Sequence, residues 1–170
     1  WNTDIREYAD ESAEAIALRT GGKGATLLTA VWVAMQDNGI DIATFYRGND
    51  PDINAETFYG MFYANGKPKR IALAFSLWAK LAAHPQRLDI SSTSQTSLWM
   101  LAGQNNEGEI ALLIANPTNT TFRYTITGVE KRLTTLLQVS DANEQMQSLG
   151  IKGNVIEIGS NTVQLIIMTQ

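Results

Sequence analysis

Cysteine is absent from this sequence, and histidine is almost absent. Among 170 residues there is no cysteine and one histidine, His84. Without cysteine the chain can form neither a disulfide nor a thiolate metal site, and a single histidine excludes a multi-histidine metal site. His84 stands in an Ala-Ala-His-Pro segment, where we expect a histidine at a helix C-terminus or on the surface. The sequence therefore gives no support for a metal centre.

A net positive charge and a long apolar run are also missing. The formal net charge is -4, and the basic residues are scattered apart from Lys67, Lys69 and Arg70. Nucleic-acid binding needs a basic face, so we expect no nucleic-acid partner. No stretch reaches the roughly 18 to 20 apolar residues needed to cross a bilayer, so we expect no membrane span. The composition is equally compatible with cytoplasmic, periplasmic and secreted locations.

Residues 1–85 have the pattern of alternating helices and strands. Glycines at positions 21, 22 and 24 precede an apolar run with helical spacing over 27–35, and an Asn-Gly pair follows it. Residues 40–46, Ile-Asp-Ile-Ala-Thr-Phe-Tyr, are mostly apolar, which predicts a parallel strand buried on both faces. A polar loop follows at 47–52, and a second helix is predicted over 71–81. This order of helix, strand and helix predicts α/β architecture.

Residues 86–170 have a different pattern, with short runs rich in Val, Ile, Leu and Thr between turn signals. The predicted strands are 98–103, 109–116, 121–127, 133–139, 154–158 and 162–168. The polar stretch 141–148 is expected to hold a short helix or a loop. Many short strands with regular turns predict an antiparallel β-sandwich. We place the boundary between the two halves near 85–92.

Three motifs in the first half are similar to those of a known family. They are Trp-Asn-Thr at 1–3, Phe-Tyr at 45–46, and Phe-Tyr-Ala-Asn-Gly-Lys-Pro-Lys at 62–69. Together they resemble the last quarter of a clan A glycoside hydrolase, most like family 39, the β-xylosidase and α-L-iduronidase type, or a related exopolysaccharide glycosidase. The resemblance implies that residues 1–85 are the last βα units of a (β/α)8 TIM barrel. It also implies that residues 86–170 are a β-sandwich accessory domain.

The resemblance further implies that the two catalytic carboxylates lie outside this sequence. In the family the nucleophilic Glu ends the seventh barrel strand and is followed by a Trp-Asn-like motif, so it is expected directly before Trp1. The acid is expected from the fourth strand, which also precedes Trp1. None of the carboxylates present matches either motif, so we expect no catalytic residue in this chain. Retaining glycosidases need only two carboxyl groups, so no cofactor is implied.

Five residues are predicted to contact substrate. Trp1 and Asn2 follow the expected nucleophile and should lie at the pocket floor or just behind it. Tyr46 could stack on a sugar ring, and Arg47 could bind a hydroxyl or a uronate; both could instead be surface residues. Asp50 could accept hydrogen bonds from sugar hydroxyls, or it could be an ordinary turn residue beside Pro51.

Tryptophans elsewhere in the chain have simpler interpretations. Trp32 and Trp78 lie on apolar helix stripes and are predicted to be core residues. Trp99 is either a core residue or a carbohydrate-binding aromatic of the sandwich.

The sequence thus supports two functions. The first is the C-terminal part of a retaining glycoside hydrolase, inactive alone, whose partners are an oligo- or polysaccharide and the N-terminal part of the same barrel. The second is a non-catalytic carbohydrate-binding or structural β-sandwich module. A relative that has lost catalysis but kept binding is a third possibility. A lone parallel strand would leave backbone groups unpaired, so the first half must either be completed by the rest of the barrel or repack on the sandwich.

Overall fold

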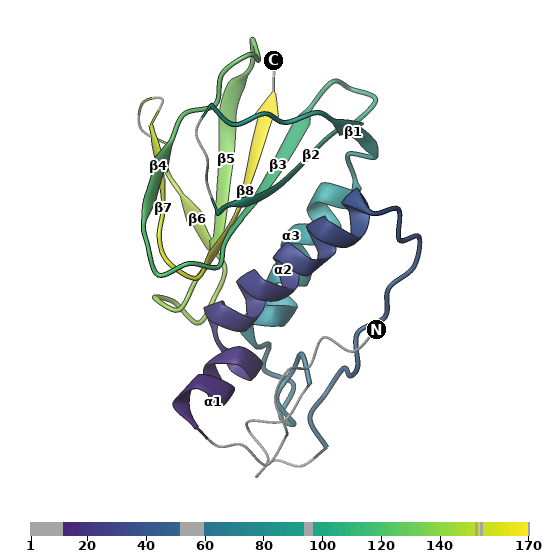
Figure 1. The fold of residues 1–170 in the computed structure, drawn as a ribbon, viewed down its shortest axis with the longest axis vertical. Helices are drawn as coiled ribbons and strands as arrows, with labels where there is room; N and C mark the ends of the chain where they lie inside the picture. The colour runs from purple at the N-terminus through teal and green to yellow at the C-terminus, as the bar shows by residue number, and fades with distance from the viewer. Residues whose placement is uncertain (1–11, 52–59, 94–96, 152, 154, 170) are drawn as a thin grey trace.

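The structure is a computed structural model that describes residues 12–51, 60–93, 97–151, 153 and 155–169. The helices are α1 Ala13–Thr20, α2 Gly22–Asp37 and α3 Arg70–Ala82. The strands are β1 Gln86–Leu88, β2 Trp99–Gln104, β3 Ile110–Asn116, β4 Phe122–Tyr124, β5 Arg132–Val139, β6 Gln147–Leu149, β7 Ile156–Ile158 and β8 Thr162–Thr169. Figure 1 shows α2 and α3 lying side by side against one sheet.

The strands form two antiparallel sheets. One has six strands in the order β1-β2-β3-β8-β5-β6, and the other has two, β4 and β7. The helices α2 and α3 cover one face of the larger sheet, and β4 and β7 lie over its other face (Figure 1). The pairing of two antiparallel sheets agrees with the predicted β-sandwich.

The central strand β3 shows why a sheet covered on both faces reads as a continuous apolar run. Every residue from Ile110 to Asn116 is buried. Leu113 and its cross-strand partner Leu165 join a core that includes Val33 and Leu77 of the helices. Leu112, one residue away on the opposite face, joins a second core with the smaller sheet. Alternating side chains therefore serve two cores, so the strand has no polar face.

The α1–α2 junction explains the glycine cluster seen in the sequence. A Cβ on Gly24 would lie 1.9 Å from the carbonyl oxygen of Leu18, and a Cβ on Gly22 would lie 2.5 Å from that of Asn161. Gly21 caps α2 but has no side chain to accept its first amides. The carboxylate of Asp141 does so instead, accepting from the Gly22 amide at 2.5 Å. The loop after β5 thus caps a helix about 120 residues earlier in the chain.

Charged contacts join the helical layer to the sheet at both ends. Lys67 pairs with Glu144 at 2.6 Å, and the hydrogen bond that it donates lowers the pKa of the Glu144 carboxyl. At the other end, Arg87 of β1 pairs with Asp37 at the end of α2. All of these side chains are exposed, so solvent and salt screen both pairs and their contribution to stability is small.

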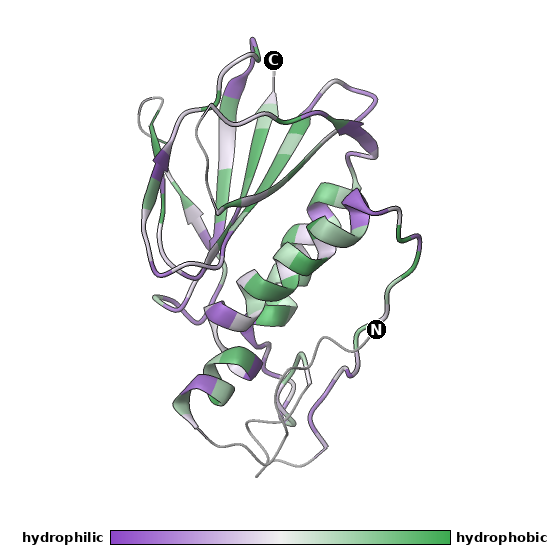
Figure 2. Cartoon of the chain, viewed as in Figure 1, coloured by the Kyte–Doolittle hydropathy of each residue, from purple (hydrophilic) through white to green (hydrophobic). Residues whose placement is uncertain are grey.

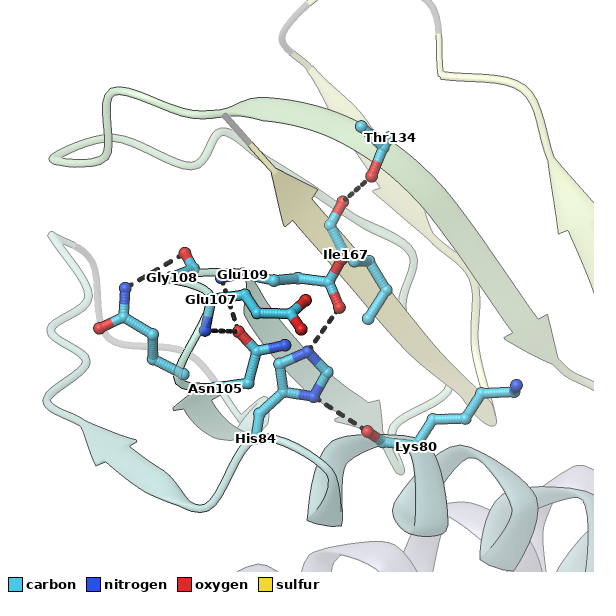
Figure 3. Close-up of polar contacts among 9 residues, drawn as sticks. Lys80, His84, Asn105, Glu107, Gly108, Glu109, Thr134 and Ile167 are labelled. Atoms are coloured by element: carbon cyan, nitrogen blue, oxygen red, sulfur yellow. Dashed lines mark hydrogen bonds and ion pairs between the residues drawn. The ribbon is translucent and has the colours of Figure 1, made fainter.

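His84 follows α3, as its sequence context predicted, but it is buried rather than on the surface. Figure 3 shows its ring between Lys80 and Glu109. Its Nδ1 lies 3.0 Å from the Lys80 carbonyl oxygen, and its Nε2 lies 2.9 Å from Glu109 Oε1. The β2–β3 turn carries Glu109. The side chain of Asn105 holds this turn by accepting from the Glu109 amide at 2.9 Å. These contacts make His84 a structural link between α3 and the β2–β3 turn.

All six predicted strands are present, with ends shifted by a few residues. The stretch 141–148 was predicted to hold a helix or loop, but it contains the start of β6 at Gln147. The short strand β1 was not predicted at all. Both predicted helices, over 27–35 and 71–81, are present as α2 and α3.

The strand predicted over 40–46 is wrong for this structure. Those residues form an extended segment without strand pairing, and Ile42 is 83% exposed. Figure 2 shows hydrophobic residues along this segment, on the outside of the molecule. A parallel strand needs a neighbour, and the described residues contain no other parallel strand; their parallel pairing is a single bridge between Asn49 and Phe62. The barrel part of the predicted fold is therefore not formed by the residues described.

A partly buried polar network joins the two sheets of the sandwich. The hydroxyl of Tyr124 donates to Gln164 Oε1 at 2.7 Å. The Gln164 amide donates to Gln138 Oε1 and to the carbonyl of Glu157, each at 2.8 Å. Burial raises the pKa of the Tyr124 hydroxyl well above its ordinary value of 10.0, because a phenolate would lose its hydration there.

The raised pKa of Tyr124 predicts a loss of stability in alkali. Above pH 10 the unfolded chain releases the Tyr124 proton while the folded chain keeps it, so the free energy of unfolding should fall as the pH rises. The slope from this one group approaches about 1.4 kcal/mol per pH unit. Urea unfolding of the protein and of Tyr124→Phe between pH 9 and 11 measures it. The variant should lose this component of the slope, and equal slopes would contradict the assignment.

Candidate functional site

The segment after α2 is fixed to the helical layer by one aromatic residue. Phe45 packs edge-on against Phe75 of α3, with ring centroids 5.8 Å apart. Phe75 in turn packs on Trp32, at 4.2 Å between centroids, in a core that also includes Trp78. Trp32 and Trp78 are thus core residues, as predicted. This anchor holds the next two residues outside the core.

Tyr46 and Arg47 form an exposed aromatic and cationic pair. Tyr46 is 73% exposed. The guanidinium carbon of Arg47 lies 5.8 Å from the centroid of the Tyr46 ring, and Arg47 Nε donates to the Asn49 carbonyl at 2.7 Å. The peptide bond between the two residues is cis. The pair presents a flat apolar ring beside a fixed positive charge, which suits stacking on a sugar ring and bonding to its oxygens.

Main-chain hydrogen bonds hold the residues after this pair against 60–62. The Met61 amide donates to the Arg47 carbonyl at 3.1 Å, and the Phe62 amide donates to the Gly48 carbonyl at 3.0 Å. The Asp50 amide returns a bond to the Phe62 carbonyl at 2.9 Å. The position of Arg47 is therefore set by a strand-like contact with residues that lie more than ten positions later.

Asp50 lies behind this contact in a buried ion pair. Its Oδ2 is 2.7 Å from Lys69 Nζ, and both side chains are 0% exposed. Its Oδ1 accepts from the Gly60 amide at 2.8 Å. Burial lowers the pKa of the Lys69 ammonium, and the hydrogen bond and charge of Asp50 oppose that shift. The Tyr63 ring covers the ammonium at 5.1 Å from its centroid.

Of the five residues predicted to contact substrate, the structure describes three, Tyr46, Arg47 and Asp50. Tyr46 and Arg47 are adjacent and partly or largely exposed, and Asp50 is close in sequence but fully buried. Trp1 and Asn2 lie outside the described residues, so their predicted roles stay predictions. The role of Asp50 as a sugar ligand also stays a prediction, although its carboxylate is engaged with Lys69 and Gly60.

Sequence reasoning missed Lys69 as part of this region. The only signal was its place in the Gly-Lys-Pro-Lys motif, between Pro68 and the start of α3. Trp99 was predicted to be either core or a sugar-binding aromatic, and it is 41% exposed at the start of β2. Trp99 is therefore neither a fully buried core residue nor a fully exposed aromatic residue.

Most carboxylates in the described part of residues 1–85 take part in ion pairs. Of the four carboxylates, Glu14 pairs with Lys23, Asp37 with Arg87, and Asp50 with Lys69. The fourth is Asp41.

The residues that the structure describes contain no cluster of three potential metal ligands. None of their helices is long and apolar enough to span a bilayer.

Comparison with solved structures identifies the class of fold. A GH39 β-xylosidase from Caulobacter crescentus matches 91% of this chain with a TM-score of 0.64 and 10% identity. The GH39 enzyme from Xanthomonas axonopodis pv. citri matches 94% at a TM-score of 0.60 and 12% identity. The catalytic domain of GH30 xylanase C from Talaromyces cellulolyticus matches 83% at 0.60 and 16%. The resemblance to clan A glycoside hydrolases is thereby confirmed at the level of the fold.

The same comparisons show how much of those proteins the chain represents. It spans 41%, 43% and 35% of the three structures, respectively. No protein-family model matches the sequence. No curated protein matches it either. The matched region includes helices as well as sheets, because each match covers more than the 85 residues of the sandwich half.

Proposed function

We propose that this chain is the C-terminal part of a retaining glycoside hydrolase that cleaves O-glycosyl bonds in an oligo- or polysaccharide. The observation that carries the proposal is the structural match to GH39 and GH30 enzymes across both the helical layer and the sandwich. Residues 1–85 would complete a (β/α)8 barrel, and residues 86–170 would be its accessory β-sandwich. The exposed apolar segment 40–46 supports this, because it has the composition of a barrel strand and lacks a neighbour here.

The proposal gives each predicted residue a role at the mouth of the barrel. Active sites of such barrels lie where the strands end at their carboxyl side, which is the position of Tyr46 and Arg47 after 40–46. Tyr46 would stack on a sugar ring, and Arg47 would bind a hydroxyl or a uronate. Trp1 and Asn2 would lie at the pocket floor. Asp50 would contribute through the loop that it holds rather than through direct contact.

The chemistry would be supplied by the N-terminal part of the same barrel. A retaining mechanism needs a nucleophilic carboxylate and an acid–base carboxyl about 5 to 5.5 Å apart. The nucleophile is expected directly before Trp1 and the acid on an earlier strand, so the chain alone would be inactive. This reaction needs no metal and no organic cofactor.

A non-catalytic carbohydrate-binding module is the second candidate. It is favoured by Trp99, an aromatic residue that is 41% exposed on the sandwich rather than on the barrel side. The two candidates place sugar binding at different residues, so one experiment can separate them.

The separating experiment is performed on the protein that includes the preceding barrel. We expect Tyr46→Ala and Arg47→Ala each to raise KM for an aryl β-xyloside about tenfold, the effect of about 1.4 kcal/mol of lost binding. Trp99→Ala is the matched control and should leave KM unchanged. Replacing a Glu that precedes Trp1 by Gln should abolish turnover.

Other outcomes would reject the enzyme proposal. Absence of hydrolysis toward aryl glycosides, together with glycan binding that Trp99→Ala removes, would establish the module instead. A residue other than Glu before Trp1 would argue against catalysis in the same way.

A further inference from the structure

Lys69 connects three segments that are separate in sequence. Its amide donates to the Met61 carbonyl at 2.9 Å, and Lys69 is also the N-cap residue of α3. Its ammonium reaches Asp50 at 2.7 Å, in a place with 0% exposure. A single residue thus contacts 50, 61 and the first turn of α3.

Asp50 is packed closely against Gly60. A Cβ on Gly60 would lie 2.5 Å from Asp50 Oδ1 and 2.6 Å from the Asp50 amide nitrogen. The absence of a side chain at position 60 lets the carboxylate accept the Gly60 amide while it faces Lys69. A carboxylate without its counter-charge in this place would have to move toward water, because isolated buried charges are strongly unfavourable.

Movement of Asp50 would be transmitted to the exposed pair. Asp50, Gly48 and Arg47 are bonded to 61–62 by consecutive main-chain hydrogen bonds. Arg47 Nε is bonded to the Asn49 carbonyl, which lies within the same segment. The orientation of the Arg47 side chain therefore depends on the backbone that Asp50 and Lys69 hold.

We propose that Lys69 is a positioning residue: its buried pair with Asp50 fixes segment 47–50 against 60–62 and so holds Tyr46 and Arg47 in the orientation that binds sugar. The sugar-binding half of this statement rests on the proposed function. The loop-fixing half rests on contacts within the chain, and it is measured separately.

The test uses Lys69→Met in the full protein, at a temperature well below its unfolding transition. Methionine keeps the length of the side chain and removes its charge. We expect hydrogen exchange of the amides of Asp50, Met61 and Phe62 to accelerate at least about tenfold while exchange in β3 and β8 stays unchanged. KM for the aryl glycoside should rise about tenfold, with a smaller change in kcat.

Two further variants separate positioning from simple destabilisation. Asn116→Ala removes a buried side chain that bonds the carbonyls of Thr120 and Gly159 at 2.7 Å, far from this loop in sequence. It should lower stability without changing KM or the exchange of Asp50. The double variant Asp50→Asn with Lys69→Met removes the ion pair but leaves no unpaired charge and keeps an acceptor for Gly60, so the exchange of these amides should stay accelerated if the pair itself fixes the segment.

The proposal is overturned if Lys69→Met leaves exchange in 47–50 and 60–62 unchanged, or if it accelerates exchange equally in these residues and in the sheet. It is also overturned if the loop opens and KM stays the same. If the original protein hydrolyses no glycoside, the proposed function fails, and exchange alone still decides whether Lys69 fixes the loop.

Discussion

Gly103→Ala is expected to lower the free energy of unfolding by about 3 kcal/mol or more, close to the upper range for overpacking. A Cβ at this position would lie 2.0 Å from the carbonyl oxygen of His84. That oxygen belongs to backbone that cannot easily move, because His84 lies two residues after the end of α3 and β1 pairs with β2 from Gln86 onward. Urea denaturation followed by circular dichroism measures the change.

Gly150→Ala is the matched control for this prediction. A Cβ on Gly150 would meet nothing within 4 Å, so this variant should be within about 0.5 kcal/mol of the original protein. A Gly103→Ala protein as stable as the Gly150→Ala protein would show that the end of α3 does not lie against β2 as described.

Leu113→Ala is expected to cost about 3 to 5 kcal/mol, the range for emptying a tightly packed core position. Leu113 is 0% exposed, and it lies where the helical layer meets the centre of the larger sheet. The surrounding residues come from strands on both sides and from two helices, so they cannot collapse into the cavity. Thermal and urea unfolding measure the loss.

Ile42→Ala is the contrasting variant, because Ile42 is 83% exposed. In this chain it should change stability by less than about 0.5 kcal/mol. In a protein that also contains the preceding barrel, the same substitution should cost several times more, because the proposed strand 40–46 would be buried on both faces. Equal, small effects in both proteins would contradict the barrel proposal, and a small effect of Leu113→Ala would contradict the described core.

The sheet was predictable because its central strands are buried on both faces. Residues 110–116 are almost wholly apolar, residues 162–169 have an apolar majority, and turn residues mark their ends. By contrast, β1 and β6 have three residues each and a polar composition, and they form only because a longer strand offers them an edge. The residues of β1 and β6 do not themselves indicate that a longer strand lies beside them.

The error over 40–46 has a related cause. The composition of this segment is that of a strand, but a strand exists only when another pairs with it. The sequence predicted the preference of the segment, and the structure shows that the described residues do not supply the partner.

The candidate site was predicted only where it rests on local motif. Tyr46 and Arg47 follow directly from the end of an apolar run, and they are adjacent whatever the fold. The pairing of Asp50 with Lys69 joins positions that a loop separates, and both residue types are usually exposed, so nothing in the sequence marks them as buried partners. The Asp141 cap on α2 escaped prediction for the same reason.

The place of β8 has a consequence for the order of events during synthesis. This strand follows all the other described strands in the chain, yet it lies in the middle of the larger sheet, between β3 and β5. While the ribosome is making residues 12–161, the two halves of that sheet have no common neighbour, and the apolar faces of α2 and α3 have only part of their final cover. Until residues 162–169 have left the exit tunnel, the nascent chain therefore exposes apolar surface and unpaired strand edges that favour aggregation.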